Sequence, residues 1–147
     1  IQAFSKANPD WHLRVYRTPA GFRVLALQRT FDPMEAEAAR CFAALHADPL
    51  YLKMCLNQQC FRARVSPKPW RMGVNRHLRP RPGVWPVAPE QLPARQEWVE
   101  HYNRLATGFA ACRFVERLGS DVSHPDALAV QRLHDELCRA QMELPLA

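Results

Sequence analysis

The sequence predicts an α+β fold in which about four helices cover one face of a small antiparallel sheet. Residues 12–18 and 21–28 alternate apolar and polar side chains, and the Pro- and Gly-containing turn at 18–21 predicts that they form a β-hairpin. Residues 60–66 alternate in the same way, which predicts a third strand with a basic outer face. The helices are indicated by apolar side chains that recur every three or four positions.

The first two predicted helices share one start signal, an aspartate followed by proline. The side chains of Asp32 and Asp48 can accept hydrogen bonds from the free backbone N–H groups in the first turn of a helix. Proline fits the first helical position, because it has no N–H group to leave unbonded. The helix that begins at Asp32 has one apolar stripe, and the helix after Asp48 is expected to end near Asn57. The stripe consists of Met34, Ala38, Cys41, Phe42 and Leu45.

Two longer helices are predicted to complete the chain. One covers residues 94–118 and ends at Gly119, because glycine commonly terminates a helix. The other begins at Ser123 and continues to about Gln141. Its inward-facing residues are expected to be Val130, Leu133, Leu137 and Met142.

Residues 66–93 form a predicted long loop, because they contain seven of the 13 prolines and follow neither a helical nor a strand period. Loops of this length are unusual in a small domain and are commonly functional. The loop also contains large apolar residues, which argue against disorder and indicate that it packs against another surface, of this domain or of a partner. They are Trp70, Met72, Val74, Leu78, Val84 and Trp85.

Length and composition are those of one globular domain covering residues 1–147. Hydrophobic residues make up 48% of the chain and charged residues 23%, and no run of 18 apolar residues occurs. Because the sequence starts with Ile1 rather than an initiator methionine, we expect the C-terminal part of a longer chain. The expected compartment is the cytoplasm, with tethering to the inner membrane by an upstream segment as the alternative.

The positive charge is concentrated between Asp48 and Glu90. This stretch carries eight of the 20 Lys and Arg residues and none of the 14 acidic residues, although the formal net charge of the whole chain is only +6. Such a field attracts nucleic acid, nucleotide phosphates or acidic headgroups.

The predicted binding site combines cations with an exposed aromatic side chain. Guanidinium groups bind phosphate in a bidentate manner, and tryptophan stacks on bases. Its residues are Arg62, Arg64, Lys68, Trp70, Arg71, Arg76, Arg79 and Arg81. The sequence thus favours a non-enzymatic domain that binds an anionic partner, with nucleic acid as the first choice.

Two other interpretations of this basic stretch remain open. The arginines could instead pair with acidic helices, chiefly at Glu35, Glu37, Glu97 and Glu100. The Pro/Trp loop could also dock into a protein partner, which would make the chain an interaction or scaffolding domain.

Cysteine and histidine give weaker indications. The five cysteines include no CxxC pair, and their spacing from histidine does not fit a zinc knuckle, so we expect neither a metal nor a cofactor. His134 could contact Cys138 or Arg132 across one helical turn, but a structural role is favoured. Cys55 or Cys60 beside His77 is a minor candidate nucleophile. No known catalytic motif occurs.

Four pieces of the chain resemble a family of bacterial proteins without an assigned activity. They are YRTPAGFRVL, DPLYLKMC, CFRARVSPKPWRMG and RPRPGVWPV. This resemblance spans nearly the whole chain, and it implies that an anchor upstream of the domain occurs in some members. It implies no reaction.

A weaker likeness is to the archaeo-eukaryotic primases. Residues 18–23 stand where that family has a Ser-Gly-x-Gly-x-His hairpin, and residues 62–70 stand where it has a later strand and basic loop. Arg23 replaces the primase histidine, and no Asp-x-Asp pair is present. The resemblance therefore implies a non-catalytic derivative, with a nucleotide-handling enzyme as the third alternative.

Overall fold

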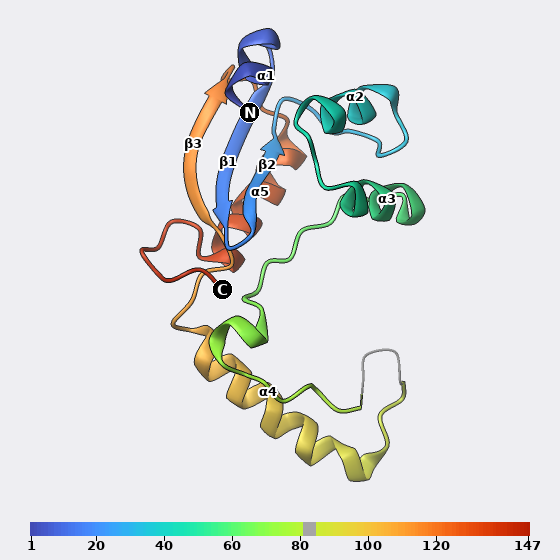
Figure 1. Ribbon diagram of the computed structural model, residues 1–147, viewed down its shortest axis with the longest axis vertical. Coiled ribbons are helices and arrows are strands. Elements are labelled where there is room, and N and C mark those ends of the chain that lie inside the picture. Colours follow the sequence, from blue (N-terminus) through green and yellow to red (C-terminus); the bar gives the residue numbers. More distant parts are fainter. Residues whose placement is uncertain (81–84) are drawn as a thin grey trace.

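A computed structural model describes residues 1–80 and 85–147, and it has the α+β architecture that the sequence predicts. One three-stranded antiparallel sheet has the strand order β2-β1-β3, and helix α5 lies against one of its faces (Figure 1). The elements in chain order are α1 (Gln2–Ala7), β1 (His12–Thr18), β2 (Gly21–Ala26), α2 (Ala36–Ala44), α3 (Pro49–Gln58), α4 (Leu92–Ala106), β3 (Arg113–Gly119) and α5 (Pro125–Cys138).

The N-terminal hairpin forms as predicted. Strand β1 pairs with β2 in a register that places Tyr16 opposite Arg23 and Thr18 opposite Gly21. At the turn, the Thr18 hydroxyl accepts a hydrogen bond from the Ala20 N–H and donates one to the Gly21 carbonyl. The hairpin therefore rests on local turn chemistry that the sequence contains in full.

The prediction of a strand at residues 60–66 is wrong, and the third strand is β3. A strand requires a ladder of backbone hydrogen bonds, whereas residues 60–66 are extended without one and contact β2 through the Arg23 side chain. Strand β3 pairs with the free edge of β1, with an irregularity beside Val15 where β3 contributes an extra residue.

The predicted helix over 94–118 is also wrong in its second half. Helix α4 ends at Ala106, and the chain turns at Thr107 and Gly108 before it enters β3. Gly119 is not a helix stop but the last residue of β3, with a φ of 81°. Burial alternates along residues 114–119 in the structure, but polarity does not alternate in RFVERL, because two apolar residues, Phe114 and Val115, are followed by two charged ones. The sequence therefore lacks the apolar-polar alternation that predicts a strand.

The other helices lie close to their predicted positions. Asp48 caps α3 by accepting a hydrogen bond from the Leu50 N–H at 2.8 Å, as expected. Asp32 instead caps a turn through the Met34 N–H, so that α2 begins only after Glu35. Among the described residues, no helix combines the length and apolar character needed to cross a membrane.

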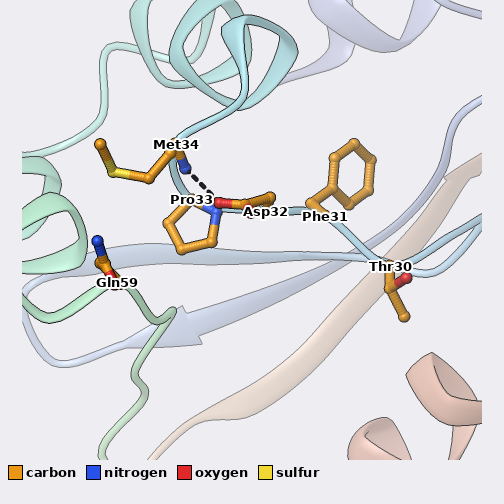
Figure 2. Close-up of a pocket in the computed structure, with 6 residues that line it drawn as sticks. All are labelled: Thr30, Phe31, Asp32, Pro33, Met34 and Gln59. Carbon is orange, nitrogen blue, oxygen red and sulfur yellow. Dashed lines mark hydrogen bonds between the residues drawn. The ribbon is translucent and has the colours of Figure 1, made fainter.

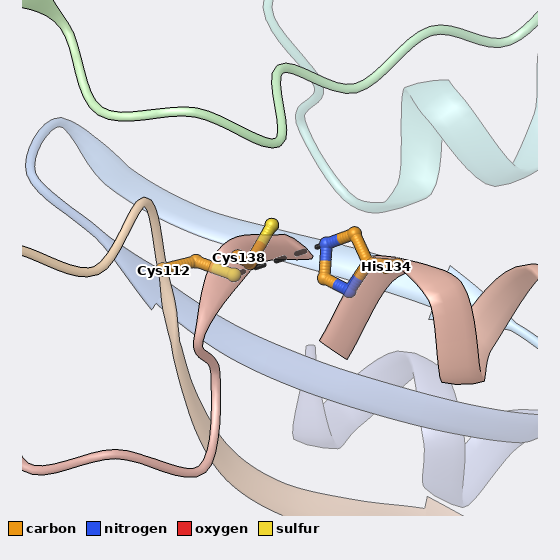
Figure 3. Close-up of side chains that lie close together, drawn as sticks. All are labelled: Cys112, His134 and Cys138. Carbon is orange, nitrogen blue, oxygen red and sulfur yellow. Dashed lines mark hydrogen bonds between the residues drawn. The ribbon is translucent and has the colours of Figure 1, made fainter. Parts of the chain in front are cut away.

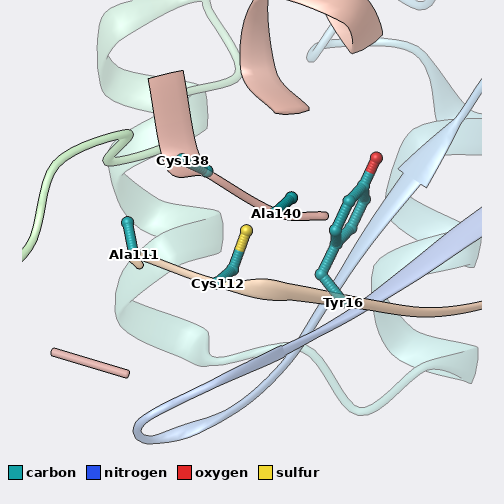
Figure 4. Close-up of a cluster of buried hydrophobic side chains, with 5 residues drawn as sticks. All are labelled: Tyr16, Ala111, Cys112, Cys138 and Ala140. Carbon is teal, nitrogen blue, oxygen red and sulfur yellow. The ribbon is translucent and has the colours of Figure 1, made fainter. Parts of the chain in front are cut away.

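Helix α5 faces the sheet with a different side from the one predicted. Val130, Leu133 and Leu137 are 49–57% exposed, as is Met142 beyond the helix, whereas His134 and Cys138 are buried. The buried cluster around them consists of Tyr16, Ala111, Cys112, Cys138 and Ala140 (Figure 4). The helix thus packs a polar and sulfur-bearing face on the sheet and exposes its apolar stripe.

The chain between α3 and α4 leaves the sheet and returns along α4 (Figure 1). Its described residues contain one short 3₁₀ turn, Pro69–Met72, and otherwise have no regular structure before residue 89. Met72 packs with Ala106 and Ala147, and Val74 is buried as well. Part of this predicted loop is therefore docked through apolar side chains, as the sequence suggested.

Candidate functional site

The basic segment, defined here as residues 60–81, presents its cations to solvent. The described arginines of the predicted site are all exposed, and Lys68 is partly exposed. Arg81 lies outside the described residues. The exposed members are Arg62, Arg64, Arg71, Arg76 and Arg79.

None of these cations forms an ion pair with an acidic side chain in residues 1–80 and 85–147. Three of the four glutamates suggested as partners have other contacts, and Glu97 forms no ion pair with a described residue of the basic segment. Glu35 and Glu37 both bind Arg29, the former at 3.0 Å. Glu100 accepts a hydrogen bond from Gln96 on its own helix. Within the described part of the chain, the basic segment is not neutralised by acidic helices.

Two tryptophans accompany the cations at the surface. Trp70 is 60% exposed and Trp85 is 81% exposed, so neither is used as a core residue. The Lys68 ammonium lies 5.2 Å from the centre of the Trp70 ring, a cation–π distance. Removing the surface of such a large ring from water is favourable, and a nucleic-acid base that stacks on the ring removes it.

The basic segment is attached to the rest of the protein by hydrogen bonds to its main chain. The Arg23 guanidinium donates to the Arg64 carbonyl at 2.9 Å, and the Tyr102 hydroxyl donates to the Pro67 carbonyl at 2.8 Å. The Trp98 indole N–H donates to the Arg76 carbonyl at 2.6 Å. These contacts are made to the backbone of the segment. Among its described charged side chains, Arg62 donates a hydrogen bond to Gln58 Oε1 at 2.6 Å and Lys68 lies beside Trp70, but none is paired with a carboxylate.

A second cluster lies between the sheet and α5, and the sequence did not predict it. Cys112 precedes β3, while His134 and Cys138 are one turn apart on α5 (Figure 3). Their three donor atoms all lie within 4.8 Å of one another, and all three residues are buried. The sequence signal for this cluster was the i,i+4 spacing of His134 and Cys138, which places them on one helix face. The position of Cys112 could not be predicted, because the sequence predicts a helix over residues 94–118, where the structure has β3.

Arg23 reaches this cluster from β2. Its Nη1 atom lies 2.7 Å from His134 Nε2, 3.8 Å from Cys112 Sγ and 3.6 Å from Cys138 Sγ. Because a guanidinium only donates, His134 Nε2 accepts this bond and the imidazole proton lies on Nδ1, which faces Asp135 Oδ1 at 3.1 Å. Arg23 therefore has a role inside the fold, where it joins β2 to α5 and to the residue before β3.

The two thiols of the cluster differ in acidity. A hydrogen bond from the Cys112 thiol, together with the Arg23 charge and contact with His134, outweighs burial and lowers the pKa of Cys138 to about 5. The pKa of Cys112 is raised, because that thiol donates to Cys138 and is buried. The guanidinium of Arg23 therefore lies beside the more acidic of the two thiols.

The surface depressions offer less chemistry. One, about 500 Å³ in volume, is lined by Thr30, Phe31, Asp32, Pro33, Met34 and Gln59 (Figure 2). Its one carboxylate, Asp32, is occupied by the Met34 N–H, and a second depression beside α1 also has a single carboxylate, Glu37. Neither depression brings together the two carboxylates that metal-dependent nucleotidyl transfer uses.

Comparison with known proteins gives no match to any family model, curated protein or solved structure. The resemblances to the bacterial family and to the primases therefore remain predictions from sequence.

Proposed function

We propose that this domain binds an anionic partner, with nucleic acid as the first choice, through the side chains of the basic segment. The observation that carries the proposal is that its described cations are exposed or, for Lys68, partly exposed, and form no ion pair with a described acidic side chain, while its backbone is held by three hydrogen bonds. A held backbone lowers the entropy lost on binding, and free guanidinium groups can each engage a phosphate.

The exposed tryptophans favour single-stranded nucleic acid among the anionic partners. An unpaired base can stack on an exposed ring such as Trp70, whereas bases in a duplex are already stacked on each other. Replacement of Trp70 by alanine is expected to weaken single-strand binding by about 1–3 kcal/mol and duplex binding much less. Fluorescence anisotropy with labelled single-stranded and duplex DNA of equal length measures this difference.

The charge contribution is tested by removing four cations together. The combined variant Arg62→Gln, Arg64→Gln, Lys68→Gln and Arg71→Gln removes up to four phosphate contacts. If all four contact phosphates, the wild-type affinity should fall about 100-fold between about 50 and 200 mM salt from these contacts alone, and the variant should lose that part of the salt dependence. Binding to single-stranded DNA, duplex DNA and RNA is measured at both salt concentrations.

The matched control removes the same charge from elsewhere on the surface. Lys6, Arg40, Arg104 and Arg132 are exposed and lie outside the basic segment, so their replacement by glutamine changes net charge equally. This control should retain most of the wild-type affinity. Equal losses in both variants would place binding outside the basic segment, and a salt-independent affinity would favour the protein-interaction alternative.

A further inference from the structure

Cys112, His134 and Cys138 converge as ligands of a metal ion do. Cys112 Sγ and His134 Nε2 are 3.8 Å apart. In tetrahedral zinc sites, with bonds of about 2.3 Å to sulfur and about 2.0 Å to nitrogen, ligand atoms are separated by about 3.5–3.8 Å. The spacing of this pair therefore needs almost no adjustment to hold an ion, and the third donor atom lies within 4.8 Å of both.

The imidazole is fixed in the orientation that a metal ligand needs. His134 Nδ1 faces Asp135 Oδ1 at 3.1 Å, which leaves Nε2 as the atom on the side of the cluster, where it accepts a hydrogen bond from Arg23 and lies 3.8 Å from Cys112 Sγ. Asp135 is held in turn by Arg14 and by the Tyr16 hydroxyl, each at 2.7 Å. A carboxylate behind the ligating histidine is a regular feature of zinc sites.

The position between the three donor atoms is occupied by a positive charge. Nη1 of Arg23 contacts all three of them, at 2.7–3.8 Å. This shows that the cluster attracts a cation and that its donor atoms point to one place. The arginine enters from strand β2 at the edge of the sheet and also contacts the partly solvated basic segment, so its head group has a route outward.

We propose that Cys112, His134 and Cys138 are the protein ligands of a thiophilic divalent cation such as Zn²⁺, and that Arg23 moves aside to admit it. Binding replaces the guanidinium by the ion, and both cysteines ligate as thiolates, with the protons of their thiols released to water, so that two thiolates balance the two charges of the ion. Three protein ligands leave one tetrahedral position for water or another ligand. This site is independent of the proposed binding of anions.

Cobalt provides a direct test, because Co²⁺ bound to thiolates in a tetrahedral site absorbs in both the near-ultraviolet and the visible. Wild-type protein kept reduced with a phosphine is titrated with Co²⁺, and Zn²⁺ is then added as a competitor. The proposal expects one equivalent of Co²⁺ to produce both bands and Zn²⁺ to abolish them. Absence of both bands at millimolar Co²⁺ would overturn it.

Variants then identify the ligands. Cys112→Ser and Cys138→Ser are expected to remove the charge-transfer band, whereas Cys55→Ser, which alters a buried cysteine outside the cluster, should leave it unchanged. Removing the competing charge with Arg23→Gln should strengthen Co²⁺ binding at least about tenfold, since like charges a few ångströms apart repel strongly in a protein interior. Binding by Arg23→Gln but not by wild type would overturn the proposal, because Arg23 would then be the permanent cation of the cluster.

A measurement on the wild-type chain guards against variants that fail to fold. Alkylation by iodoacetamide in mild denaturant, followed by mass mapping, reports each of the five cysteines separately. Zn²⁺ should slow the labelling of Cys112 and Cys138 more than that of Cys41, Cys55 and Cys60. Equal protection of all five cysteines would indicate general stabilisation and contradict a site at this cluster.

Discussion

Replacement of Gly119 by alanine is expected to destabilise the fold by about 3 kcal/mol or more. A Cβ at this position would lie 1.9 Å from the Trp11 carbonyl oxygen, and the residue has a φ of 81°, which L side chains rarely adopt. The same oxygen accepts a hydrogen bond from the Ser120 N–H at 2.8 Å, so the backbone cannot separate without losing a contact. Urea denaturation followed by circular dichroism measures the loss.

Two other glycines separate the steric clash from the backbone strain. Gly73 has a φ of 82° but open space around it, so Gly73→Ala should cost about 1–2 kcal/mol from the backbone alone. At Gly108 the nearest atom to an added Cβ is the Leu105 carbonyl oxygen at 3.6 Å, an ordinary contact, and Gly108→Ala should be nearly neutral. A Gly119→Ala variant no less stable than Gly73→Ala would show that β1 and β3 can move apart freely.

Replacement of Asp135 by alanine is expected to cost about 3 kcal/mol or more, because it leaves buried polar groups without an acceptor. Asp135 accepts hydrogen bonds from Arg14, Tyr16 and Gln131, each at 2.7 Å. Arg14 also lies over the Phe114 ring, 4.1 Å from its centre, and cannot turn to solvent without losing that contact. The midpoint of urea unfolding reports the change.

The control for this variant is a solvent-exposed ion pair on the same sheet. Arg117 and Asp121 are 2.6 Å apart, but both are largely exposed, so Asp121→Ala should change stability by less than about 1 kcal/mol. Similar losses for Asp121→Ala and Asp135→Ala would contradict a special role for the buried network.

Acid should reduce the difference between wild type and Asp135→Ala. Burial alone would raise the pKa of Asp135, but hydrogen bonds from Tyr16, His134 and Gln131, with the Arg14 charge, lower it below its ordinary value. The carboxylate therefore contributes its full stability above its unfolded pKa of about 3.9, and the contribution falls as the pH drops through the lower folded value. Unfolding curves at several pH values below about 5 should show the two proteins converging.

Local signals predicted part of the fold correctly. The hairpin and α3 depend on turn and cap residues that lie next to each other in the sequence, and both form where expected. The location of the third strand could not be predicted in this way, because residues 60–66 alternate in polarity whereas residues 113–119, which form β3, do not. Which of them pairs with β1 is decided by tertiary contacts rather than by the pattern itself.

Helix α5 illustrates the limit of periodicity more sharply. Its apolar stripe indicates the face that hydrophobicity alone would bury, yet the buried face carries His134, Asp135 and Cys138. That face is satisfied by Arg14, Tyr16 and Arg23, which come from the hairpin far away in sequence. Burial of a polar helix face can be predicted only if the residues that pair with it are known. A single sequence does not show which residues those are.

The attachment of the basic segment through its backbone affects how the sequence of this surface can change in evolution. The carbonyls of Arg64, Pro67 and Arg76, through which the segment is held, are present whatever side chains those residues carry. Substitutions among the exposed side chains thus leave these anchors intact. The choice of partner can therefore drift, or be redesigned, at little cost to folding, much as loop sequences vary on a constant framework.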